Sequence, residues 1–328
     1  MRNGPLAVVA ASVLWGTAGT AGLLVSADSV ALAAARLVVG GAALALVAGA
    51  GLKRAVKPGL LLGAVAVAAY QLCFFAAVSR TGVAIGTVVA IGSGPVFTGL
   101  LSWVLHGRRP TRRWSAATAA AVLGCAALIV GGGAEVGAEA GTQAGAEVGA
   151  QAGAEVGAQM VAGVGLALLG GLLYAFYAVM AARAIGQGGQ SNAVMGVMFG
   201  GAALIMVPVL AVSGVGWIGE PRALLAVLYL GLGTTALSYF LYGRGLRTTP
   251  VATAATLSLA EPAVAALLGL VVLGERLAPV SIAGLVLLGL SLVAVAVPER
   301  RQGRGRTPEG ERAAGEGRTA ERELESQP

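Results

Sequence analysis

Long apolar runs separated by short polar breaks form the main pattern of this 328-residue sequence. Most runs last about 20 residues, and at about 1.5 Å rise per residue a helix of that length crosses the roughly 30 Å hydrocarbon core of a bilayer. Hydropathy separates the second and third runs least, and Lys53, Arg54, Lys57 and Pro58 mark the break between them. The pattern predicts ten transmembrane helices, at 5–26, 29–51, 58–79, 82–105, 113–132, 161–183, 192–213, 222–243, 250–273 and 278–297.

The composition agrees with an integral membrane protein. Hydrophobic residues make up 57% of the chain and charged residues 11%, whereas an ordinary soluble domain carries about 25% charged residues. The net charge of +7 does not indicate nucleic-acid binding, because the basic residues sit in short clusters between apolar runs without interleaved aromatic side chains. We therefore expect the lipid bilayer and a small-molecule substrate as partners and no nucleic acid, and a homo-oligomer is left open.

The distribution of Lys and Arg predicts the orientation in the membrane. With the N-terminus inside, the inner side holds eleven basic residues: Arg2, Lys53, Arg54, Lys57, Arg108, Arg109, Arg112, Arg113, Arg183, Arg244 and Arg247. The outer side holds three, Arg80, Arg222 and Arg276. Since cytoplasmic loops carry the excess of positive charge, both termini are expected in the cytoplasm of a multi-pass protein of the cell membrane.

Two segments are not expected to enter the membrane. Residues 133–160 repeat Gly, Ala, Glu, Val and Gln at short intervals, and this glycine content predicts a flexible, low-complexity outer loop. Residues 298–328 are rich in Gly, Arg and Glu and are expected to form a disordered cytoplasmic tail. The chain then divides into a first repeat at 1–132, the loop at 133–160, a second repeat at 161–297 and the tail.

An internal repeat relates the two halves. Residues 70–110 align with 237–277 at a constant offset of 167, which pairs Arg80 with Arg247, Thr81 with Thr248, Pro95 with Pro262, and Gly107 with Gly274. Because each half holds five spans, an odd number, the second half must enter the membrane from the opposite side. Inverted repeats are typical of secondary transporters, in which two near-equivalent packings open to opposite sides.

Short motifs in this order resemble the EamA-type branch of the drug/metabolite transporter superfamily. They are Leu14-Trp15-Gly16, Arg36-Leu37, Leu259-Ala260-Glu261-Pro262-Ala263 and Leu273-Gly274-Glu275-Arg276-Leu277. The resemblance covers about 5–132 and 161–297, and it implies ten helices around a central cavity and export of a metabolite or drug. The first half departs from the pattern, since His106-Gly107-Arg108-Arg109 lacks the acidic residue that the second half has.

Two charges inside apolar spans are the first candidates for function. Arg36 is the eighth residue of the span that starts at 29, and a charge at that depth is costly unless it is compensated. It is expected to face a cavity and attract an anionic group, although it could instead reach the interface or pair structurally. Glu261 is expected to couple transport by carrying a proton, or alternatively to stabilise the kink at Pro262 or pair with Arg36.

Amphipathic side chains within the spans complete the candidate site. Trp15, Tyr70, Gln71, Tyr174, Tyr177 and Tyr239 are predicted to line the substrate cavity with Arg36, and each could instead belong to an interface belt or a helix pair. Pro95, preceded by Gly92-Ser93-Gly94, and Pro262 are predicted hinges.

No motif for enzymatic chemistry is present in the sequence. It contains neither HExxH nor GxxxxGK[ST] nor GxSxG, its single His stands in a basic loop, and its two Cys lie apart in apolar runs. We therefore expect no cofactor, no metal and no enzyme. The sequence favours a secondary transporter of a small polar metabolite, such as an amino acid, directed outward, and the alternative is a non-transporting membrane sensor or scaffold that uses its basic tail.

Overall fold

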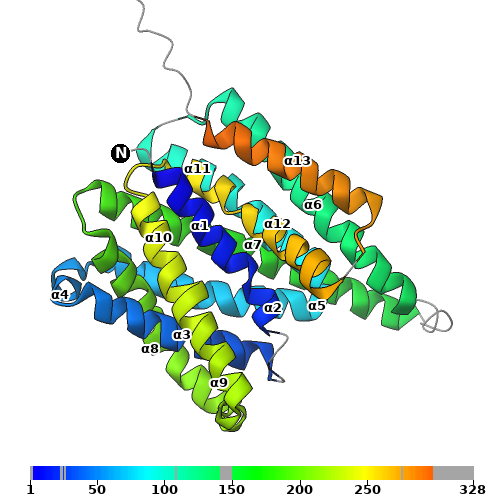
Figure 1. The fold of residues 1–328 in the computed structure, drawn as a ribbon, viewed down its shortest axis with the longest axis horizontal. Helices are drawn as coiled ribbons and strands as arrows, with labels where there is room; N and C mark the ends of the chain where they lie inside the picture. The colour runs from blue at the N-terminus through cyan, green and yellow to red at the C-terminus, as the bar shows by residue number, and fades with distance from the viewer. Residues whose placement is uncertain are drawn as a thin grey trace, which may run out of the picture. The chain divides into compact units, whose positions relative to one another are not determined.

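The computed structural model describes residues 3–22, 25, 27–107, 109–140, 150–274 and 276–297. For His106, Leu273 and residues 132–140 and 150–156 it describes the backbone alone. Helices joined by short turns make up these described segments (Figure 1). Glu275, the middle of the predicted outer loop at 141–149 and the predicted tail at 298–328 lie outside the described residues.

Helices follow the apolar runs along the whole described chain. The first half contains α1 (Gly4–Gly16), α2 (Ala18–Gly22), α3 (Ser29–Ala48), α4 (Gly51–Ala55), α5 (Pro58–His106) and α6 (Arg112–Ala140). The second half contains α7 (Ala150–Gly186), α8 (Ser191–Ser213), η1 (Gly216–Gly219), α9 (Pro221–Leu228), η2 (Tyr229–Leu237), α10 (Ser238–Gly245), α11 (Val251–Leu257), α12 (Ala260–Leu268), η3 (Gly269–Leu273) and α13 (Pro279–Ala296). The predicted all-helical membrane architecture is confirmed.

Nine helical segments among the described residues are long and apolar enough to cross a membrane. One of them, Pro58–Leu105, has 48 residues, which at 1.5 Å per residue is about 70 Å and twice the thickness of the hydrocarbon core. It is divided at Gly82, whose backbone is not helical (φ 79°, ψ 162°). The two parts correspond to the spans predicted at 58–79 and 82–105, so the nine segments supply ten crossings.

We expect Gly82→Ala to destabilise the protein by about 1–3 kcal/mol, because the backbone angles of Gly82 are essentially restricted to glycine. Gly165→Ala is the matched control, because Gly165 lies inside helix α7 and no atom lies within 4 Å of a Cβ added there. There, alanine should be neutral or stabilising. Thermal unfolding in detergent measures both, and equal melting temperatures would contradict the expectation.

The predicted outer loop at 133–160 differs from the structure at both of its ends. Helix α6 continues to Ala140 and α7 begins at Ala150. The physical reason is that both segments extend membrane-spanning helices that are already nucleated, so each further residue only propagates the helix. The Ala, Glu and Gln positions favour the helix enough to offset the glycines there.

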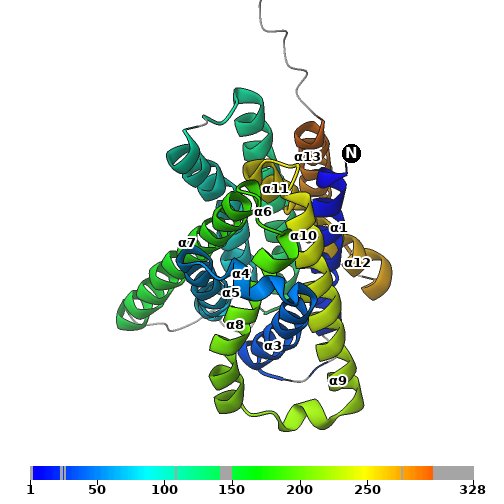
Figure 2. The same cartoon turned by 90° about the vertical axis from the view of Figure 1, so that its left-hand side faces the viewer.

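The packing of the helices follows the internal repeat. Spans that hold the same place in the two halves pair with each other, α3 with α8 and α6 with α13 (Figures 1 and 2). The first span of each half instead packs against the third and fourth spans of the other half. Thus α1 contacts α10 and α12, while α7 packs along α5. This exchange is the arrangement that two inverted repeats produce.

Equivalent glycines make the same contacts in both halves. A Cβ added to Gly4 of α1 would overlap Thr248, and a Cβ added to Gly163 of α7 would overlap Thr81. The sequence repeat had already paired Thr81 with Thr248. Because the offset was found from sequence and the contacts from structure, the two observations support the repeat independently.

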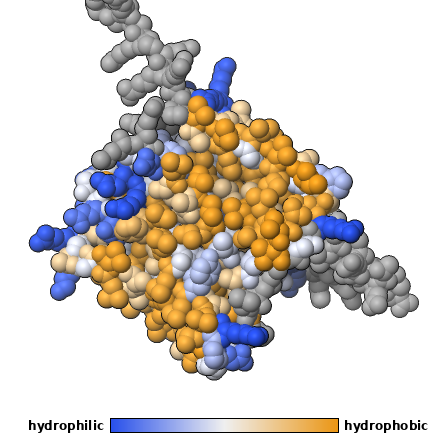
Figure 3. Space-filling model, in the orientation of Figure 1, coloured by the Kyte–Doolittle hydropathy of each residue, from blue (hydrophilic) through white to orange (hydrophobic). Residues whose placement is uncertain are grey.

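The surface is apolar over most of the face seen in Figure 3, with hydrophilic residues gathered at its margins. Large hydrophobic side chains are exposed on many helices, including Leu46 of α3, Leu204 of α8 and Val271 of η3. A soluble protein rarely exposes such large apolar areas, whereas these side chains suit contact with lipid tails.

Candidate functional site

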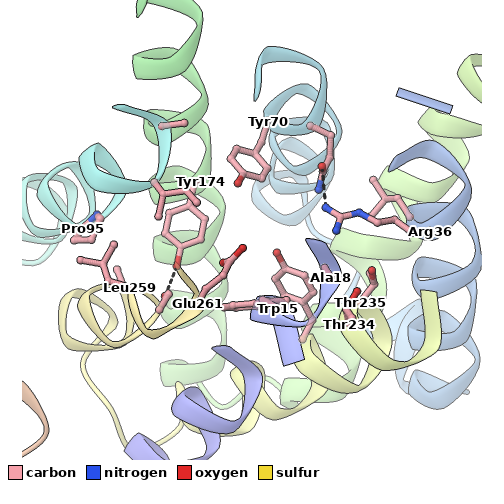
Figure 4. Close-up of a pocket in the computed structure, with 17 residues that line it drawn as sticks. Trp15, Ala18, Arg36, Tyr70, Pro95, Tyr174, Thr234, Thr235, Leu259 and Glu261 are labelled. Carbon is pink, nitrogen blue, oxygen red and sulfur yellow. Dashed lines mark hydrogen bonds between the residues drawn. The ribbon is translucent and has the colours of Figure 1, made fainter. Parts of the chain in front are cut away.

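A cavity lies between the two repeats, near the middle of the helices that form it. The empty space inside it, counted together with its open side, is about 740 Å³. Seventeen residues line it: Trp15, Ala18, Arg36, Leu37, Tyr70, Gln71, Ala90, Ile91, Pro95, Tyr174, Thr234, Thr235, Tyr239, Ala255, Ser258, Leu259 and Glu261 (Figure 4). Both halves of the chain contribute, as expected for a site at the interface of inverted repeats.

Most of the residues predicted from sequence meet in this cavity. Six of the seven predicted substrate-binding residues line it, together with Glu261 and Pro95. Tyr177 is the exception, since it is only 2% exposed and its hydroxyl lies 3.2 Å from the hydroxyl of Tyr239, outside the cavity lining. Pro262 is also buried and does not line the cavity.

Arg36 enters the cavity from α3. Its Nη2 donates a hydrogen bond to Oε1 of Gln71 at 3.1 Å, which holds the guanidinium against α5. An arginine side chain has five N–H donors, and the bond to Gln71 is the one hydrogen bond that Arg36 makes with the described residues. Its remaining donors are therefore suited to receive a carboxylate or another anion.

Glu261 enters the cavity from the opposite side, at a break in the ninth span. Helix α11 ends at Leu257 and α12 begins at Ala260. Pro262 lacks the N–H that would bond the Ser258 carbonyl, and the backbone N–H of Glu261 donates to that carbonyl at 3.0 Å instead. Interrupted helices of this kind form binding sites in transporters, and the break places Glu261 in the first turn of α12.

The two charges do not form an ion pair. Within the described residues no N–O distance of 4.0 Å or less joins Arg36 to Glu261, and the Glu261 carboxylate has no hydrogen-bond partner there. Figure 4 shows the carboxylate directed to the middle of the cavity and the guanidinium reaching in from the opposite side. Each charge is thus presented to the cavity.

Aromatic rings pack closely against one side of the cavity. Trp15 lies 4.9 Å from Tyr239 and 5.5 Å from Tyr242 between ring centroids, and Phe199 lies 3.9 Å from Tyr239. Tyr242 is fully buried. Tyr177 joins this aromatic cluster, with its ring centroid 6.5 Å from that of Tyr239 and 6.1 Å from that of Phe199.

Hydroxyl groups supply the polar contacts that the sequence did not identify. Thr234 and Thr235 line the cavity from η2, and both hydroxyls donate to the Leu230 carbonyl. Ser258 shares a 2.8 Å hydrogen bond with the Tyr174 hydroxyl. The sequence signal for these residues was weak, because a hydroxyl inside a span can equally bond its own helix backbone.

Trp15 has a polar atom without a partner. Its side chain is 8% exposed, and its Nε1 has no hydrogen-bond acceptor within the described residues. A buried donor left unpaired costs about 1–3 kcal/mol. Trp15 lines the cavity, but the Nε1 atom itself is buried away from accessible space.

The predicted hinge residues lie in two different settings. Pro262 follows the break between α11 and α12, whereas Pro95 lies inside helix α5 and lines the cavity. Hinge motion at either position remains a prediction. The described residues contain no group of three His, Cys, Asp or Glu side chains that could hold a metal ion.

Comparison with known proteins finds a match over most of the chain. The EamA-like transporter family matches residues 2–130 and 161–297. The uncharacterized transporter YwfM of Bacillus subtilis (strain 168) is 37% identical over 303 residues, which cover 90% of this chain and 95% of that protein. A crystal structure with 21% sequence identity superposes with a TM-score of 0.71 over 89% of this chain and 96% of its own, and it supports the fold alone.

Proposed function

Because the chain belongs to the EamA-like transporter family, we propose that it carries a small polar metabolite, such as an amino acid or a related compound, outward across the cell membrane. The family consists of membrane transporters and not of enzymes. The observation that carries the proposal is the cavity between the repeats, into which Arg36 and Glu261 project without pairing. The lining combines apolar side chains with polar groups that can fix the orientation of a small molecule.

Alternating access is the proposed mechanism. The exchange of contacts between halves supports it, because two inverted repeats can adopt each other's conformations and so open the cavity to either side. The basic residues near the start of α1 and around α4 support a cytoplasmic location for that end of the bundle. Both termini then lie on the cytoplasmic side of the membrane.

Counterflow in proteoliposomes tests this function. Purified full-length protein is reconstituted with an unlabelled pool of amino acids and other polar metabolites inside, and uptake of each labelled member is followed. Saturable uptake that protein-free liposomes lack is the expected result. If folded protein gives no counterflow for any member, the proposed substrate class is wrong.

We also propose Glu261 as the coupling residue, and this predicts an effect of a pH gradient. A carboxyl group within the bundle can bind and release a proton during the cycle. Imposing a proton gradient should accelerate transport by the wild-type protein. Glu261→Gln cannot exchange a proton, so its transport rate should be the same with and without the gradient. Uptake with and without an ionophore measures the difference, and an equal response in the variant would remove the coupling role.

A further inference from the structure

Two opposite charges share one cavity and do not neutralise each other directly. Arg36 belongs to the first repeat and Glu261 to the second, and each is half-buried. A charge removed from water is costly unless it is paired. Because no ion pair joins them within the described residues, a bound molecule that supplies both complementary charges would compensate both at once.

The Arg36 side of the cavity is built to receive an anion. Gln71 accepts one N–H from Nη2 and is itself only 5% exposed. This hydrogen bond holds the plane of the guanidinium group. The other N–H groups of Arg36 have no acceptor among the described residues. A fixed planar fork matches the two oxygens of a carboxylate, which can accept parallel hydrogen bonds.

The Glu261 side is built to receive a cation. When it is ionised, its carboxylate can only accept hydrogen bonds, and no donor among the described residues bonds to it. Rings of Trp15, Tyr70, Tyr174 and Tyr239 line the same cavity, and the faces of aromatic rings attract ammonium groups. The hydroxyl of Ser258, three residues before Glu261, adds an acceptor for an N–H donor.

From this arrangement we propose that the cavity selects zwitterions, with the anionic group of the substrate on Arg36 and its ammonium group on Glu261. The proposal rests on the proposed transport function and names the charge pattern of the substrate. A molecule with one charge would compensate one side chain and leave the other without a partner. A zwitterion compensates both and adds no net charge to the bundle.

Three matched pools of compounds test the charge pattern. The first contains leucine, methionine, glutamine and serine, the second the corresponding acids without the amino group, and the third the corresponding amines without the carboxylate. Each is titrated against the purified full-length protein in detergent, and the rise in melting temperature reports binding. The zwitterion pool should act at concentrations at least about tenfold lower than either other pool, because each lost charged contact weakens binding by that order.

Two variants then test which side chain binds the anionic group of the substrate and which binds its ammonium group. In Arg36→Gln the advantage of the zwitterions over the amines should disappear, and in Glu261→Gln their advantage over the deaminated acids should disappear. A purely structural role would weaken all three pools alike. Glu220→Gln, which changes an exposed acid at the start of α9, should keep the wild-type order.

Several results would overturn the inference. Equal potency of a singly charged pool on the wild type, no stabilisation by any pool, or uniform loss in both variants would each contradict it. Counterflow of a metabolite with only one charge would leave the transport function standing and remove the zwitterion preference. Absence of all counterflow would instead count against the proposed function itself.

Discussion

Arg36→Ala is expected to lower saturable counterflow by about ten- to a hundredfold, because it removes the charged donors that face the cavity. Hydrogen bonds to charged groups contribute about 1.5–3 kcal/mol each, and loss of one such contact is sufficient for this range. Arg36→Lys keeps the charge but not the planar fork, so we expect activity between the wild type and Arg36→Ala. Initial rates in proteoliposomes with equal amounts of protein give the comparison.

A second arginine provides the control for this experiment. Arg80 is exposed at the end of the first part of α5, and its Nη1 donates to the Ala76 carbonyl of its own helix at 2.7 Å. It does not line the cavity, so Arg80→Ala should transport at nearly the wild-type rate. Comparable losses in both variants would show that the effect of Arg36 is not specific to the cavity.

Replacing Arg36 should also change stability in a way that depends on Glu261. Arg36 and Glu261 are half-buried in one cavity, so removing one of them leaves the other charge uncompensated, which should destabilise the protein more than removing both. The double variant Arg36→Gln with Glu261→Gln should therefore melt at a higher temperature than at least one of the single variants, although it should not transport. Additive losses of stability would indicate that the charges act independently in the absence of substrate.

Gly284→Leu is expected to prevent stable folding, because α6 and α13 cross in backbone contact at this residue. A Cβ on Gly284 would lie 2.6 Å from the Gly124 carbonyl oxygen, and one on Gly124 would lie 2.7 Å from the Leu288 backbone nitrogen. The obstacles are backbone atoms, which cannot move aside as a flexible side chain can. Overpacking of this kind costs about 1–3 kcal/mol or more, and a leucine must also separate the two helices.

Gly289→Leu is the matched control on the same helix. Gly289 is exposed, and no atom lies within 4 Å of an added Cβ, so a leucine there would face lipid. We expect this variant to elute as a single peak in size-exclusion chromatography with a melting temperature near that of the wild type. Gly284→Leu should aggregate or be absent from the membrane fraction, and a normal elution profile for it would show that the crossing can widen without loss of the fold.

The sequence by itself determined the class of protein, the number of crossings and the duplication. Each of these is a local or periodic property: a run of about 20 apolar residues has few stable alternatives to a spanning helix, and repeated Arg, Pro and Gly at one offset persist whatever the packing. The break between the third and fourth spans was also readable, because Gly82 begins the second apolar run. The helical conformation at the glycine-rich ends of the predicted outer loop could not be read from the sequence, because these segments are helical only as extensions of the adjoining spans.

Tertiary structure alone decided which polar side chains share the cavity. Tyr174 and Tyr177 are three residues apart on one helix, yet Tyr174 lines the cavity and Tyr177 packs behind Tyr239. Ser258 reaches the site because the ninth span is interrupted before Pro262. The sequence left open whether Arg36 and Glu261 pair, and the structure places them apart on two repeats. The physical reason is that depth in the membrane is set along one helix, whereas the direction of a side chain relative to its neighbours is set by how helices from both repeats cross.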